Sequence, residues 1–494
     1  MPTSRREPIA KVDTAWLRME QPTNLMMITG VMVLDDPVDF NHFKQIISNR
    51  FLAFPRFRQK AVDHARGCWW EEDEDFEISA HVRRTALPGD AGKAELEELV
   101  SELASTPLDK TKPLWQFHLV ENYVEGPVVI TRIHHCYADG IALVQVILSL
   151  TETSAEASNR LVTQEEWKHK RAAESNIFRR LTAPAREGVG AITHLSGKVL
   201  DEAVHLLREP HTAADYAVGA GEIASELATA LLLHDDPPSR FKGAIGVRKN
   251  VSWAEPIELE EVKAIGKALG CTVNDVLISV MTGALHRYLV DQGDDPSGLT
   301  MRATVPVNLR PLEHARELGN HFGLVFLDLP IAEANPLARL YQVAEFMHDL
   351  KQSKQAVMSM GLLAALGMGP SALQKPALEL FSRKASTVLT NVPGPQETLY
   401  LAGSAIGEMM AWVPQSGSIG MGISIISYRG KVFSGLITDN KRIPDPDSVT
   451  ADFRREFENL LNLTLLLGPQ DGPVDPGMAE MMHEWIDGDG EEPG

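Results

Sequence analysis

Residues 128–151 read VVITRIHHCYADGIALVQVILSLT, and this stretch carries the strongest structural signal in the chain. Its β-branched, apolar start predicts a strand through Ile133, and the segment CYADG predicts a turn. Apolar residues then recur in a pattern that predicts a helix from about Ile141. We expect Gly140 to give the backbone the freedom to leave the turn and start this helix. A strand, a turn and a helix in immediate succession indicate a mixed α/β (α+β) fold.

Two adjacent histidines close the predicted strand. Successive side chains on a strand point to opposite faces, so His134 and His135 cannot both face one cavity. A neutral imidazole, with a pKa of about 6.5, can take the proton of a hydroxyl or a thiol that attacks a carbonyl. For a bare pair of histidines an ordinary core or surface role is the more frequent explanation. The full spacing H-H-x-x-x-D-G, which ends at Asp139 and Gly140, is far more specific.

Other nucleophiles find little support in the sequence. The chain has no G-x-S-x-G nucleophile elbow, so covalent serine catalysis is not indicated. Cys136 follows the histidines directly, and a sequence neighbour at a strand end usually points away, so we interpret it as structural.

The rest of the chain extends the mixed pattern on both sides of a helical section. Residues 1–151 are expected to form a first half and residues 241–467 a second, while 152–240 show helical patterns without strand candidates. The last residues, 468–494, contain no Lys or Arg and are expected to be a disordered acidic tail. The expected strands are 25–34, 114–124, 299–309, 322–330, 386–392, 421–428 and 431–439, and the expected helices are 39–54, 93–108, 258–270, 273–292, about 336–383 and 448–467.

Composition limits the possible partners. The formal net charge of −20 argues against nucleic-acid binding and against purely electrostatic attachment to anionic membranes. No segment has the roughly 20 apolar residues of a membrane span, and the start has no signal-peptide pattern. The three cysteines are scattered, which predicts no disulfide framework, no metal site and a cytoplasmic location.

Several blocks together resemble a known family. HHCYADG (134–140) resembles the HHxxxDG motif of CoA-dependent acyltransferases. The segments DTAWLRMEQPTNLMMITGV (13–31), STPLDKTKPLWQFHLVE (105–121), TVNDVLISV (272–280) and TNVPGPQETLYLAG (390–403) resemble, in the same order, blocks of the bacterial wax ester synthase/diacylglycerol acyltransferases. The resemblance extends from about residue 10 to residue 465.

This resemblance implies two chloramphenicol-acetyltransferase-like halves with a tunnel at their interface. It implies that His135 is a general base, which deprotonates an acceptor hydroxyl that attacks a fatty acyl-CoA. The acceptor would be a long-chain alcohol or a diacylglycerol, and the products a wax ester or triacylglycerol and CoA. Acyl-CoA would be a co-substrate, with no permanently bound cofactor and no metal. Association with a membrane or lipid-body surface would be peripheral.

The resemblance also assigns roles to further residues. His134 would support the site, and Asp139 would pair with Arg310 to fix the turn. Asn274 is a candidate donor to the developing oxyanion, with helix capping as the equal alternative. Further candidates for contact with substrate, each with a structural alternative, are Gly140, Trp115 (lining an acyl channel), Asn391, Glu20 and Asn24 (the acceptor side, or a solvated or capping role). A basic patch for CoA would draw on Arg240, Lys242, Arg248, Lys249, Arg383 and Lys384, which by default are solvated.

Two other functions are consistent with the same motif. A condensation-type domain of peptide or polyketide assembly shares HHxxxDG, but the chain shows no carrier domain. A catalytically silent lipid-binding or lipid-body coat protein could also use the fold, although the intact His135 and Asp139 argue against silence.

Overall fold

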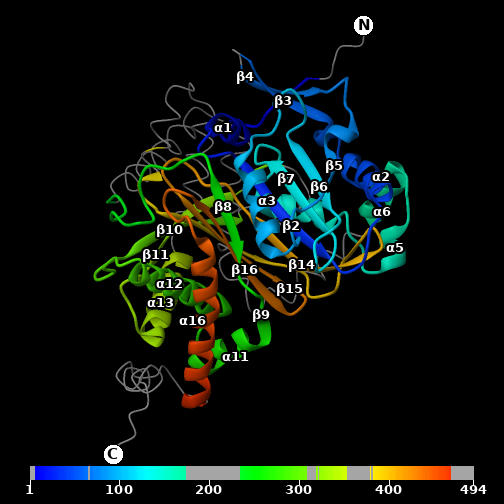
Figure 1. The fold of residues 1–494 in the computed structure, drawn as a ribbon. Coiled ribbons are helices and arrows are strands. Elements are labelled where there is room, and N and C mark those ends of the chain that lie inside the picture. The colour runs from blue at the N-terminus through cyan, green and yellow to red at the C-terminus, as the bar shows by residue number, and fades with distance from the viewer. Residues whose placement is uncertain are drawn as a thin grey trace, which may run out of the picture.

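The computed structural model describes residues 6–64, 67–173, 234–308, 319–320, 322–352, 379 and 382–468. Its strands form two large sheets and one small one, and the helices pack beside the large sheets (Figure 1). Arg310, most of the expected 152–240 connector and residues 469–494 of the expected tail lie outside the described residues.

The first large sheet is built around β7, the strand that carries the histidine motif. Every residue of β7 is buried, including Thr131 and Arg132, so its sequence does not show the apolar–polar alternation of a strand with one exposed face. The sheet order is β13-β14-β2-β7-β6-β5, and β5 is the one strand that runs parallel to its neighbour. The strands are β2 (Met27–Leu34), β5 (Val82–Thr85), β6 (Trp115–Val120), β7 (Val128–His134), β13 (Tyr400–Leu401) and β14 (Ser404–Trp412).

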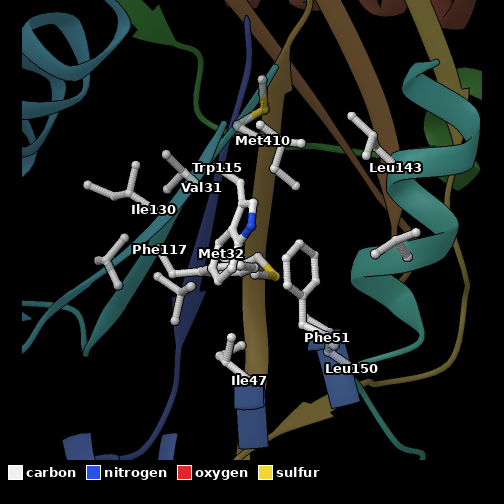
Figure 2. Packing of buried hydrophobic residues seen from close by; sticks show 14 of the residues in the cluster. Val31, Met32, Ile47, Phe51, Trp115, Phe117, Ile130, Leu143, Leu150 and Met410 are labelled. Carbon is white, nitrogen blue, oxygen red and sulfur yellow. The ribbon is translucent and has the colours of Figure 1, made fainter. Parts of the chain in front are cut away.

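Three helices contribute to the core beside this sheet. Asp39 caps the first of them, because its carboxylate accepts a hydrogen bond from the backbone N–H of His42 at 2.8 Å. These helices are α2 (Phe40–Arg50), α3 (Lys93–Ser105) and α4 (Gly140–Leu148), and the short 3-10 turns of this half are η1 (Phe51–Ala53), η2 (Pro55–Arg58) and η3 (Ile78–Ala80). Figure 2 shows side chains from several of these elements packed together in this core.

The second large sheet has seven strands. Its order is β11-β10-β12-β15-β16-β8, with β9 also paired to β16, and β10, β12 and β15 are parallel. The strands are β8 (Lys249–Trp253), β9 (Ile257–Glu258), β10 (Met301–Asn308), β11 (Phe322–Leu329), β12 (Thr387–Pro393), β15 (Met421–Tyr428) and β16 (Lys431–Asp439). A second core lies between this sheet and helices α11 (Leu259–Leu269), α12 (Val273–Asp291), α13 (Pro336–Gln352) and α16 (Pro446–Leu467), which gather in one part of the molecule (Figure 1).

The C-terminal segment contributes a strand to the first large sheet. β14 belongs to the segment expected in the second half, yet it pairs antiparallel with β2 from Ile406–Leu34 to Trp412–Thr29. Met410 of β14 packs among first-half residues such as Val31 (Figure 2). The same core also includes residues of β8 and β16, so a division of the chain at residue 241 does not describe the sheets.

Smaller elements join the halves at their edges. A three-stranded sheet, which the sequence analysis did not predict, is formed by β1 (Glu7–Pro8), β3 (Gln59–His64) and β4 (Gly67–Glu72).

The helix that follows β1, α1 (Lys11–Met19), packs its apolar face against Phe322 of β11. Of the connector, α5 (Ala155–Asn159) and α6 (Gln164–Ala173) are helical, and a β-bridge ties Glu152 to Tyr400.

The expected strands and helices are confirmed to within a few residues, except that the helix expected at about 336–383 is described only as α13, and most of residues 353–383 lie outside the described part of the chain. Helix α11 ends where its glycine predicted, because Gly270 takes a left-handed conformation with φ of 71°. Within the described residues, no single helix has the length and apolar character needed to cross a bilayer. Helices α11 and α12, which meet at 101°, reach that threshold only when taken together.

Candidate active site

The candidate site forms where β7 ends and the chain turns into α4. The backbone N–H of His135 donates to the carbonyl of Met26 at 2.7 Å, which ties the turn to the segment before β2. Asp139 caps α4, since its Oδ1 accepts from the backbone N–H of Ala142 at 2.8 Å.

The expected role of Gly140 in this turn is wrong. Its φ is not positive, and an added Cβ would meet only Val413 Cγ1, at an ordinary 3.8 Å. The helix therefore starts without needing the conformational freedom of glycine, because the Asp139 cap sets its first turn.

His134 is held by polar groups on both ring nitrogens. Its Nδ1 accepts from the backbone N–H of Cys136 at 3.1 Å, so the ring proton is on Nε2. That nitrogen lies 3.1 Å from Glu20 Oε2, and Glu20 Oε1 lies 2.7 Å from Lys110 Nζ. These contacts fit the supporting role expected for His134.

The solvated alternative for Glu20 is wrong, because its side chain is buried, whereas the capping alternative holds in position, since Glu20 is the C-cap residue of α1. Its side chain is only 8% exposed. Burial disfavours its ionisation, but His134 and Lys110 outweigh this effect and lower the pKa of Glu20 to about 2. The residue is an ionised anchor for His134.

His135 lies between aromatic rings. Its imidazole stacks on Trp16 with ring centroids 4.3 Å apart and lies 5.7 Å from the Phe322 ring at a tilt. Burial lowers the pKa of His135 to about 4, although the charge of Asp139 acts in the opposite direction. Nδ1 is enclosed and has no hydrogen-bond partner among the described residues. At neutral pH this ring is uncharged, so it has a lone pair with which to accept a proton.

A second segment of the chain pins the same turn. Gly319 donates its N–H to Tyr137 O at 3.1 Å and accepts from Asp139 N at 3.3 Å. Asn320 Nδ2 donates to His135 O at 2.9 Å and to Asp13 Oδ1 at 2.7 Å. The sequence analysis did not single out Asp13, Trp16, Asn320 or Phe322, although Asp13 and Trp16 lie in the segment 13–31 that carries part of the family resemblance.

Asp13 is a buried carboxyl group next to this turn. Burial raises the pKa of Asp13 to about 7, even though Asn320 donates two hydrogen bonds that favour its charged form.

The structure brings Asn274 and Asn391 together. Asn391 Nδ2 donates to Asn274 Oδ1 at 2.8 Å. Helix capping is the wrong alternative for Asn274, because Thr272 and Asp275 cap α12 reciprocally. A role for Asn274 as a donor to an oxyanion stays a prediction.

The turn after Asn391 depends on its glycine. Gly394 N donates to Ser427 O at 2.8 Å, and a side chain at this position would overlap that oxygen.

Trp115 is a core residue, and its expected place along an acyl channel is wrong. The side chain has no exposed surface, and its Nε1 donates to Phe57 O at 2.8 Å. His81 stacks on the indole at 4.3 Å, and Figure 2 shows Trp115 enclosed among core side chains.

Asn24 and Cys136 are both buried. Asn24 Nδ2 donates to Gly417 O at 2.7 Å and so ties the N-terminal segment to the second half. Burial raises the pKa of the Cys136 thiol well above its usual value, which agrees with a structural role.

The expected basic patch for CoA stays a prediction, and the default of a solvated position is wrong for Lys249 and Lys384, whose side chains are buried. Each of the six cations already has an internal acceptor. Arg240 binds Asp294, Arg248 binds Glu98, Lys249 binds Asp439, Arg383 and Lys384 bind Asp235, and Lys242 donates to the carbonyls of Arg383 and Ala385.

The expected Asp139–Arg310 pair cannot be located, because Arg310 lies outside the described residues. It stays a prediction, as does the tunnel between the halves.

Two family descriptions match the chain. The wax ester synthase/diacylglycerol acyltransferase catalytic domain matches residues 9–277, and the C-terminal domain of that family matches residues 318–461. A protein of Mycobacterium tuberculosis described as a diacylglycerol O-acyltransferase is 26% identical over 477 residues, which cover 92% of this chain and 90% of the relative. The diacylglycerol O-acyltransferase tgs1 of the same organism is 26% identical over 76% of this chain and 77% of its own.

Solved structures share the fold. The wax ester synthase/diacylglycerol acyltransferase of Marinobacter aquaeolei superposes with a TM-score of 0.66 at 20% identity, covering 93% of this chain and all of that one. The first condensation domain of the CDA synthetase superposes with a TM-score of 0.55 at 14% identity, covering 96% and 98%. At these identities the likeness establishes the fold alone, and it confirms the mixed α/β class expected from the sequence.

Proposed function

The chain belongs to the wax ester synthase/diacylglycerol acyltransferase family, and from that premise we propose that His135 is the base that activates the acyl acceptor. Membership makes the protein an acyl-CoA-dependent O-acyltransferase, in which acyl-CoA is a co-substrate. We assign a long-chain fatty acyl-CoA as donor and a fatty alcohol or diacylglycerol as acceptor, which is the chemistry that the names of the relatives describe.

The unequal environment of the two histidines is the observation that carries this proposal. His134 is committed to Cys136 and Glu20 through its two nitrogens. Among the described residues His135 takes part in no ion pair, and its ring is neutral and stacked on Trp16. A neutral imidazole is the form that accepts a proton, so the site supports one base and one supporting residue.

The proposed reaction balances without any other reagent. His135 takes the acceptor's hydroxyl proton while the hydroxyl oxygen bonds to the thioester carbon. The carbon–sulfur bond of the resulting intermediate then breaks, and the imidazolium returns the proton to the departing CoA sulfur. The face of Trp16 stabilises the transient imidazolium, because an aromatic face attracts a cation.

Purified protein given palmitoyl-CoA with hexadecanol, or with dipalmitoylglycerol, tests this function through CoA release and ester formation. We expect His135→Ala to lower kcat by about 100-fold or more. The matched control is His118→Gln, because His118 is also buried in this sheet and burial also lowers its pKa to about 4. Parental activity in the His135 variant would remove the base assignment. A parent that binds lipid without releasing CoA would instead favour the silent coat protein, and transfer to an amine acceptor alone would favour condensation chemistry.

We propose a cytoplasmic location with peripheral association at a membrane or lipid-body surface. The three cysteines are unpaired, which suits a reducing compartment. Cell fractionation tests both parts: recovery of the protein only in detergent extracts, or only outside the cell, would contradict them.

A further inference from the structure

The turn that carries His135 is held between two segments that lie far from it in sequence. Helix α1 brings Asp13 and Trp16, which are three residues apart and so lie on one face of the helix. The segment before β11 brings Asn320, and β11 begins with Phe322. Each segment therefore contributes one aromatic ring and one polar group to the surroundings of the same imidazole.

The orientation of the Asn320 amide is fixed by its neighbours. Its Nδ2 donates to Asp13 Oδ1 at 2.7 Å and to His135 O at 2.9 Å, and both of these atoms accept here. The same Asp13 oxygen also accepts from the Asn320 backbone N–H at 3.0 Å. A flipped amide would place its oxygen against these two acceptors, so the carboxyl of Asp13 determines which way the amide points.

Two enclosed polar atoms are left over by this arrangement. Asn320 Oδ1 and His135 Nδ1 are both buried without a hydrogen-bond partner among the described residues. Buried polar atoms are rarely left unpaired, and one is an acceptor while the other can donate. Burial has the largest effect on the pKa of His135 and lowers it, while the backbone of His135 and the Asn320 side chain act in the opposite direction and favour the protonated ring.

From these contacts we propose that Asp13 and Asn320 are positioning residues that hold His135 with its ring proton on Nδ1, so that Nε2 is the basic nitrogen. Asp13 orients the amide, and the amide holds the carbonyl of His135. The amide oxygen, Oδ1, is then the enclosed acceptor that remains for Nδ1–H, which also has no other partner among the described residues. This inference rests on the proposed function only in taking His135 as the base. The tautomer itself is a property of the resting protein.

The first test reads the tautomer directly. Long-range proton–nitrogen NMR of protein labelled at its 16 histidines distinguishes a proton on Nδ1 from one on Nε2. The His135 signal is assigned by its loss in His135→Gln. We expect the Nδ1–H form in the parent and a mixture of tautomers in Asn320→Ala. A parent ring protonated on Nε2 overturns the proposal, whether or not any variant folds.

The second test separates positioning from general stability. We expect Asn320→Ala and Asp13→Leu to lower kcat roughly 10- to 100-fold with little change in KM, because the base is misplaced. Asp13→Asn keeps an accepting oxygen and is expected to retain most of the parental kcat. The matched control is Asp236→Asn, because Asp236 is also buried and also accepts one backbone and one side-chain hydrogen bond.

The outcomes separate this proposal from the proposed function. Parental kcat in Asn320→Ala, or an equal loss in Asp13→Asn and Asp13→Leu, would overturn the positioning role. Parental kcat in His135→Ala would instead overturn the base assignment, and the tautomer measured in the parent would still stand by itself.

Discussion

The imidazole of His135 is shielded from water, because Trp16 and Phe322 pack against its ring. Burial lowers its pKa to about 4, so the neutral, basic form persists well below neutral pH. We expect kcat/KM to be flat from about pH 7 down to about pH 5 and to fall as the pH approaches 4. Initial rates after a brief pH jump measure this limb before acid unfolding intervenes. An acid limb near pH 6.5 would mean that water reaches the ring freely.

Glu20 gives a prediction about stability at the same scale. Its pKa falls from 4.5 to about 2 on folding, so its contribution is complete above about pH 4.5 and is lost as the pH falls toward 2. We expect Glu20→Gln to lower the free energy of unfolding by roughly 1–3 kcal/mol at pH 7. The difference from the parent should shrink between pH 4.5 and pH 2 in denaturant titrations. A difference that does not change with pH would show that the carboxylate charge is not the cause.

Sequence pointed to site residues only within recognised blocks, and not to every residue there: Glu20 was a candidate from the segment 13–31, whereas Asp13 of the same segment was not. His134, His135 and Asp139 stand within six positions, so one spacing reveals them together. Asn320 lies 185 residues from His135 and meets it only through the fold. The prediction for Trp115 was wrong for another reason. Tryptophan suits the wall of an acyl channel and a packed core equally well, and only the packing decides between them.

At the scale of the secondary-structure elements, helix α12 contains Gly283, whose replacement by alanine should destabilise the protein although alanine usually favours a helix. In an exposed helix, alanine is more favourable than glycine by about 1 kcal/mol. At Gly283 an added Cβ would overlap the guanidinium of Arg339 and the carboxylate of Glu456, which form a buried ion pair. We therefore expect Gly283→Ala to destabilise the protein by roughly 1–3 kcal/mol, measured by the denaturant midpoint.

Gly140→Ala is the stability control for this prediction. It also lies in a helix, and its added Cβ meets only Val413 at an ordinary distance. We expect no loss of stability in this variant. Equal losses at both positions would show that the ion pair is not responsible.

The long elements were predictable and the short or irregular ones were not. Helices such as α12 and strands such as β15 carry sustained apolar patterns that local sequence reveals. β14 escaped prediction because its pairing register shifts between Ile406 and Glu408, which interrupts its alternation. β13 and β1 have two residues each, too few to show any period.

At the scale of the whole molecule, β14 of the first large sheet packs closely against β16 of the second, and this contact joins the halves. A Cβ at Gly435 of β16 would lie 2.5 Å from Met410 Cε and 3.1 Å from Trp412 Nε1, both side chains of β14. We expect Gly435→Val to push these strands apart, lower the free energy of unfolding by roughly 1–3 kcal/mol and reduce activity. In scanning calorimetry the single transition expected for the parent should broaden or divide. A variant that melts like the parent would show that the halves do not depend on this contact.

Because β14 pairs with β2 of the N-terminal half, only certain hybrids of such enzymes can keep this pairing intact. A chimera joined at residue 241 would set a foreign β14 beside the native β2, and every pair from Ile406–Leu34 to Trp412–Thr29 would be mismatched. A hybrid should therefore take residues 399–412 from the same parent as its N-terminal half, although this segment lies far downstream in the chain. Recombination between relatives at a single crossover should yield mostly misassembled protein, whereas a double crossover that respects this strand should yield soluble hybrids.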